Sequence, residues 1–95
     1  MSEYVTVEAE STDDPNVMEL VTNQTLTEDG DEVYNSEEEM EMGSVLSQCL
    51  FFAVVGMGMT KLTITNDTLI VTRNPNLPWE VLIDELRDAL RDYYL

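Results

Sequence analysis

The side chains of this chain that could carry chemistry are one thiol and many carboxylates. Cys49 is the single cysteine, and the sequence has no histidine. A lone thiol forms neither an internal disulfide nor a Cys-x-x-Cys metal clip, and His-ligated zinc and imidazole catalysis are excluded. Cys49 could be a metal or cluster ligand or a reactive thiol. It lies on the apolar stripe of an expected helix, so we predict the buried, structural role of a small hydrophobe.

The carboxylates show no pattern that indicates a catalytic or metal site. With 20 acidic residues in 95, pairs arise by chance. Residues 27–32 lack the Asp-x-Asp-x-Asp-Gly spacing and the terminal Glu of a calcium loop. No Gly-x-Ser-x-Gly or phosphate-cradling glycine motif occurs. We therefore predict a protein that is not an enzyme, with no catalytic residue, no cofactor or metal site of its own and no evident small-molecule substrate.

The charge is strongly one-sided. Four basic residues face 20 acidic ones, for a formal net charge of −16. Nucleic acid and anionic membranes are therefore unfavourable partners. Three explanations of the acidity compete: adaptation to a high-salt (halophilic) interior, an acidic docking surface for a basic partner, and mimicry of nucleic acid. We favour salt adaptation, because the acids are spread along the whole chain and lysine is nearly absent.

Length and hydropathy predict one domain over residues 1–95. A chain of 95 residues can bury a modest core, and its hydrophobic fraction of 43% is ordinary. No apolar run reaches membrane-spanning length, and the first residues carry neither a basic region nor an apolar signal core. We expect a cytoplasmic protein.

The clearest expected element is a β-hairpin over residues 60–73. Two β-branched runs flank Asn66-Asp67, a pair that tolerates the backbone angles of a two-residue loop. Such a loop pairs Thr65 with Thr68. Because strand side chains alternate, one apolar face is expected. It consists of Leu62, Ile64, Leu69 and Val71.

Two further strands are expected before this hairpin. Residues 4–9 alternate, with Val5, Val7 and Ala9 on one side, and residues 17–21 are again extended. Residues 10–16 form a tight connection, because Asp and Asn bond their own backbone and Pro15 fixes φ. Leu26 and residues 33–34 indicate a short edge strand.

Two helices complete the expected fold. Ser36 and Glu39 form a capping box that opens the first, and Gly43 weakens its middle. Asn76 is the expected N-cap of the second, whose apolar residues recur from Trp79 to Tyr93. We predict an α+β fold with a mostly antiparallel sheet of four strands, or five with the edge strand, and two helices on one face.

The ordered segments resemble one known family. Thr12-Asp-Asp-Pro15-Asn16 is similar to the Thr-Pro-Asn-Pro-Asn turn of the N-terminal domain of Nfu/NifU-type scaffold proteins. Departures include Asp13 and Asp14 in the turn and Val45 in place of a proline. The similarity continues through Tyr34-Asn-Ser36, Ser44-Val-Leu46, Leu50-Phe51, Gly58-Met59, Asn66-Asp67, Leu69-Ile-Val71-Thr72 and Trp79-Glu80-Val81-Leu82.

This resemblance implies an accessory, protein-interaction role in iron–sulfur cluster assembly or delivery. Full-length members hold the cluster in a downstream Cys-x-x-Cys domain, whereas this sequence has one cysteine. We expect a stand-alone copy that handles a cluster only together with a partner, a scaffold or target protein. The first candidates for partner contact are Asp13, Asp14, Pro15 and Asn16, although a purely structural turn is the alternative. The competing function is a stand-alone acidic interaction protein, such as a nucleic-acid mimic or an inhibitor of a basic partner; a small carboxylate enzyme is a third.

Overall fold

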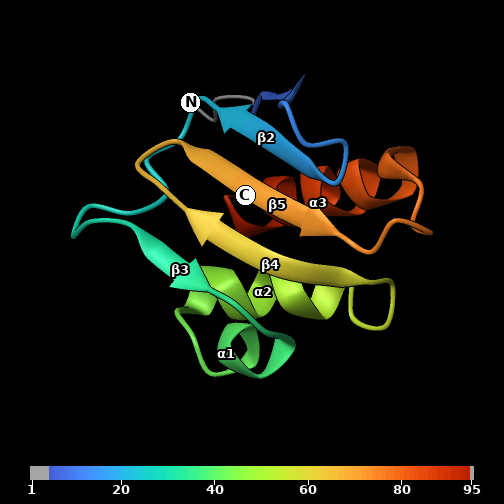
Figure 1. Cartoon of the computed structure of the whole chain (residues 1–95). Helices are drawn as coiled ribbons and strands as arrows, with labels where there is room; N and C mark the ends of the chain where they lie inside the picture. The colour runs from blue at the N-terminus through green and yellow to red at the C-terminus, as the bar shows by residue number, and fades with distance from the viewer. Residues whose placement is uncertain (1–4, 95) are drawn as a thin grey trace.

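The computed structural model describes residues 5–94, and it confirms the α+β fold (Figure 1). The sheet has five antiparallel strands in the order β1-β2-β5-β4-β3, so the short edge strand is real. Within residues 5–94 there are three helices rather than the two predicted. Along the chain the elements are β1 (Val7–Ser11), β2 (Val17–Thr22), β3 (Glu32–Tyr34), α1 (Glu37–Glu41), α2 (Val45–Ala53), β4 (Met59–Ile64), β5 (Thr68–Arg73) and α3 (Trp79–Tyr93).

The β4–β5 hairpin lies inside the sheet with the predicted register. Ile64 pairs with Leu69, Leu62 pairs with Val71, and the Thr65 amide donates to the Thr68 carbonyl over 2.9 Å. These four apolar side chains are fully buried. The hairpin therefore supplies the centre of the core, because its apolar face is the one that the helices cover.

The β1–β2 hairpin is the second predicted pair, with a shifted first strand. β1 begins at Val7 and ends at Ser11, and Tyr4 lies outside the described residues. Val5 and Val7 are buried as expected, but Ala9 is exposed, on an edge strand that has a neighbouring strand on one side alone. β2 joins this hairpin to β5, with Leu20 opposite Leu69.

Two serines divide the first helical segment. Ser36 accepts the Glu39 amide at the start of α1, and Glu39 reaches back to the Asn35 amide over 3.2 Å, completing a capping box displaced by one residue. Ser44 caps α2 by accepting the Ser47 amide. Gly43 lies between the two helices, where the chain turns.

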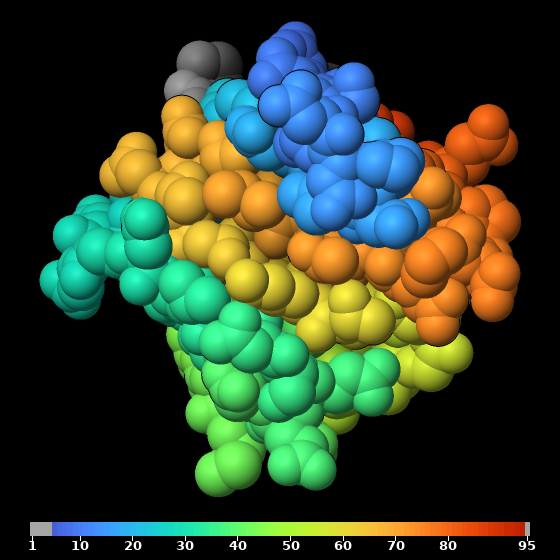
Figure 2. All heavy atoms as spheres, viewed as in Figure 1, coloured from blue at the N-terminus to red at the C-terminus, as the bar shows by residue number. Residues whose placement is uncertain are grey.

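Helices α2 and α3 cover the same face of the sheet (Figure 1), and the opposite face remains open (Figure 2). α3 begins after Pro78, which makes no side-chain cap, so the prediction of Asn76 as N-cap is wrong. Asn76 instead donates its amide to Asn74. Within residues 5–94, Asp84 and Arg87 form the one ion pair, at 3.7 Å. Asp88 and Arg91 have the same three-residue spacing on α3 and do not form a pair.

One continuous hydrophobic core fills the space between the sheet and the helices. Its fully buried members come from both the sheet and the helices, so these elements share one core. The largest of them are Leu20, Met40, Leu50, Met59, Leu62, Ile64, Leu69, Leu82, Leu86 and Leu90. Over the described residues, no helix is both long enough and apolar enough to cross a membrane.

Candidate functional site

The β1–β2 turn carries the four residues predicted to contact a partner. Thr12 holds the turn from within, because its hydroxyl donates toward the Asp14 and Val17 carbonyls over 3.0 and 2.9 Å. The Asp14 carboxylate accepts the Asn16 amide over 2.9 Å, and the Val17 amide donates to the Asp14 carbonyl. The turn chemistry expected from Asp and Asn is thus present, and it fixes the backbone shape.

Two residues from distant elements hold this turn against the body of the protein. The Trp79 indole N–H donates to the Pro15 carbonyl over 2.9 Å, and the Arg73 guanidinium reaches the same oxygen over 3.2 Å. The Arg73 amide donates to the Asn16 carbonyl. The guanidinium lies 4.8 Å from the centre of the Trp79 ring, a cation–π contact, and also donates to the Leu77 carbonyl over 2.7 Å.

Sequence reasoning found the turn but missed its anchors. Arg73 and Trp79 lie 58 and 64 residues from Pro15. One signal was available: the single tryptophan begins α3, and an arginine ends β5 at the same end of the sheet. A buried indole N–H usually finds an acceptor, so a nearby turn carbonyl was a reasonable partner to seek.

The turn presents acid to solvent on a rigid base. Asp13, Asp14 and Pro15 are exposed, and Asn16 is half-buried. The exposed carboxylates accept hydrogen bonds and attract cationic side chains, and the turn loses little conformational entropy when a partner binds. The arrangement suits recognition of a cationic surface.

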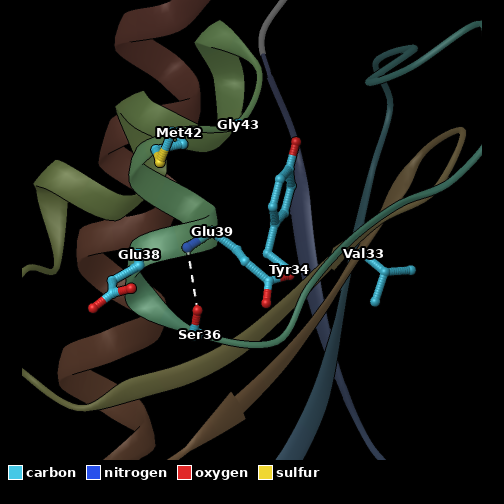
Figure 3. Close-up of a pocket in the computed structure, with 7 residues that line it drawn as sticks. All are labelled: Val33, Tyr34, Ser36, Glu38, Glu39, Met42 and Gly43. Carbon is cyan, nitrogen blue, oxygen red and sulfur yellow. Dashed lines mark hydrogen bonds between the residues drawn. The ribbon is translucent and has the colours of Figure 1, made fainter.

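A shallow groove of about 420 Å³ lies on the other side of the molecule, between β3 and α1 (Figure 3). The Tyr34 hydroxyl accepts the Ser44 amide over 3.1 Å and donates to the Glu32 carboxylate, which ties the edge strand to the start of α2. The groove is lined by Val33, Tyr34, Ser36, Glu38, Glu39, Met42 and Gly43. Two of its polar residues, Ser36 and Glu39, are the capping groups of α1, so this part of the groove follows from helix capping.

Cys49 does not lie where the sequence predicted. It is partly exposed on α2 rather than buried in the core, because the core side of α2 is formed by Leu46, Leu50 and Phe51. Within residues 5–94, no three Cys, Asp or Glu side chains come together as a metal site would require. One thiolate does not meet the ligand requirement of an iron–sulfur cluster, so these residues do not fit such a group.

Comparison with known proteins identifies the family. The model of the scaffold protein Nfu/NifU N-terminal domain matches residues 7–95. The chain belongs to the Nfu/NifU N-terminal family. The family has a role in iron–sulfur cluster assembly. No curated protein matches the sequence.

Two solved structures share the fold of this Nfu/NifU-type domain. The NifU-like protein of Saccharomyces cerevisiae, solved by NMR, is 20% identical with a TM-score of 0.73, over 94% of this chain and 77% of that one. A Staphylococcus aureus protein, solved by crystallography, is 11% identical with a TM-score of 0.65, over 93% and 99% of the two chains. At these identities the likeness concerns the fold alone.

Proposed function

We propose that this chain is a non-catalytic accessory module of iron–sulfur cluster assembly or delivery, acting in the cytoplasm through contact with scaffold or target proteins. Family membership supports the process. The anchored acidic turn supports the mode of action, because it is the feature of the described structure best suited to recognition. The observation that carries the proposal is the convergence of Arg73 and Trp79 on the Pro15 carbonyl.

The cluster is cargo that a partner holds. A cluster needs several thiolates or imidazoles, and this sequence has one cysteine and no histidine. The contribution of this chain is therefore to bind and orient a protein that carries the cluster. Its residues hold neither iron nor sulfide.

The turn contributes to such binding through charge and rigidity. Asp13 and Asp14 are exposed, whereas the backbone between them and β2 is fixed by the Thr12 and Asp14 hydrogen bonds. A partner with lysine or arginine around its contact surface gains complementary charge, which raises the association rate and sets orientation more than it adds affinity. Preorganisation keeps the entropic cost of ordering the turn small.

The test is anaerobic binding to a purified cluster-loaded scaffold protein, measured by biolayer interferometry. Asp13→Lys reverses an exposed charge that makes no turn hydrogen bond in the described structure. Asp31→Lys, also exposed but before β3, changes the net charge equally and is the matched control. We expect Asp13→Lys to weaken binding by roughly tenfold and Asp31→Lys to change it much less. Equal effects of the two substitutions would remove the turn from the interface.

The acidic surface supports a second candidate. A net charge of −16 on a chain of 95 residues fits an interaction protein that occupies the nucleic-acid site of a basic partner. Copurification with a DNA-binding enzyme, reversed by added DNA, would favour this role. A complex with a cluster scaffold that DNA leaves intact favours the first proposal.

A further inference from the structure

Helix α2 is the one part of this acidic protein without charge. Residues 42–60 contain no Asp, Glu, Lys or Arg, the longest such run in the sequence. Over the whole chain, in contrast, 25% of the residues are charged. A helix packed on a sheet normally shows charged or polar residues on its solvent side. The composition of α2 therefore needs a reason that the sheet does not supply.

The helix has two apolar faces, and the sheet covers one of them. The inner face buries Leu46, Leu50 and Phe51. Val45, Cys49 and Phe52 follow one another at spacings of four and three residues, so they form a line along the opposite side, here named the outer stripe. Val45 is 70% and Phe52 58% exposed. The turns at either end of α2 add two more exposed apolar side chains, Met42 and Val55.

The outer stripe is ordered before any partner arrives. The Phe52 ring lies 5.4 Å from the buried Phe51 ring at an interplanar angle of 60°, a favourable tilted arrangement. Cys49, between the two large side chains, is only partly exposed. Because the Phe52 ring already packs on Phe51 and valine has one preferred rotamer in a helix, burying the outer stripe costs little rotamer entropy. Exposed aromatic anchors of this kind are typical of interface centres.

Acidic helices border the stripe. α2 lies between α1 and α3 (Figure 1) and packs against both. All four glutamates of α1 are exposed, and α1 and α2 contain no basic residue. On α3 the exposed charged residues are Glu80, Asp84, Asp88, Asp92 and one base, Arg91. An apolar centre inside an acidic rim is complementary to an apolar ridge flanked by basic side chains.

We propose that the outer stripe is a docking surface for a partner protein that presents an amphipathic helix with lysine or arginine along both sides of its apolar face. A second copy of this chain is a poor occupant, because it would bring two acidic rims together. The surface lies on α2, whereas the acidic turn lies between β1 and β2, so this inference stands independently of the proposed function.

The test uses a synthetic helical peptide with leucines at helical spacing and lysines on both flanks. A second peptide keeps every lysine and replaces each leucine with serine. Both are titrated into the isotope-labelled chain and followed by NMR. Two variants are compared. The stripe variant carries both Val45→Gln and Phe52→Gln, and the control carries Val33→Gln alone. Val33 is 50% exposed on β3, so its loss removes apolar surface away from α2.

We expect the leucine peptide to shift the amide signals of α2 and to bind at least about tenfold more tightly than the serine peptide. That preference should vanish in the stripe variant and persist in the Val33→Gln control, with circular dichroism showing that both variants are folded. Equal binding of the two peptides would mean that charge alone attracts them. Signals that move elsewhere, or a dimer of the chain that Phe52→Gln dissociates, would equally overturn the proposal.

Discussion

Replacing Gly43 with alanine should destabilise this protein, although the same change in most helical settings stabilises. Gly43 does not have a positive φ, so its backbone suits any residue. A methyl group there would overlap the ring and the hydroxyl of Tyr34. Gly43 is therefore required for the close approach of the edge strand to the α1–α2 turn.

The loss in the free energy of unfolding depends on how the Tyr34 side chain responds to the added methyl group. If the ring stays, the overpacked contact costs about 1–3 kcal/mol. If the ring moves, it loses its hydrogen bonds to the Ser44 amide and the Glu32 carboxylate, about 0.5–1.5 kcal/mol each. Against this stands a gain of about 0.4–1 kcal/mol, because alanine restricts the unfolded chain. We expect a net loss of about 1–2 kcal/mol, or a melting temperature lower by roughly 4–16 °C for a domain of this size.

The assay is urea unfolding of a double-mutant cycle. In a Tyr34→Phe background the ring is released from its hydrogen bonds, so adding Gly43→Ala should cost much less than it does in the unmodified protein. Gly56→Ala is the matched control, because Gly56 has a φ of +82° and open space around it. Its cost should be the same in both backgrounds, since it arises from the backbone alone. A Gly43→Ala protein as stable as the original would refute this reasoning.

Three further outcomes are expected. Trp79→Phe keeps an aromatic ring but removes the hydrogen bond from the indole N–H to the Pro15 carbonyl, so the free energy of unfolding should fall by about 0.5–1.5 kcal/mol. Hydrogen exchange of the Val17 amide should become faster. Unchanged exchange would show that the indole does not hold the turn. Rising potassium chloride concentration should raise the melting temperature steeply, because salt screens the repulsion within a chain of net charge −16. A melting temperature that does not change with salt would count against salt adaptation. Burial, and secondarily Tyr93, raises the pKa of Tyr94 above its usual 10.0. The contribution of neutral Tyr94 to stability is therefore complete below pH 10.0 and is lost as the pH rises through the pKa of the folded state. The melting temperature of Tyr94→Phe should decline less steeply at alkaline pH than that of the unmodified protein, and identical declines would contradict this.

The elements most accurately predicted from sequence are those fixed by contacts within a few residues. The Asn66-Asp67 loop sets the β4–β5 register, and the Ser36 cap sets the start of α1, because the bonded groups lie close along the chain. The Pro15 turn was predicted for the same reason. The N-cap expected at Asn76 is two residues too early, because α3 begins after Pro78 with Trp79 packed against the core.

The sequence did not reveal which apolar side chains would be covered. A helical period placed Val45 and Cys49 on one stripe with Leu46 and Leu50, but only the latter two are buried. Because α2 has no charged residue and has large apolar side chains on more than one side, its sequence does not indicate which side packs on the sheet. Family resemblance was visible in the ordered segments, and the family model confirmed it.

By itself the sequence determined most of the elements and the acidic composition, since these depend on local hydrogen bonding and on residue content. Tertiary structure alone decided the strand order, the meeting of Arg73 and Trp79 at Pro15, and the outer side of α2. These features depend on how the sheet and the helices pack to bury one shared apolar layer, and this packing brings together residues that are far apart along the chain.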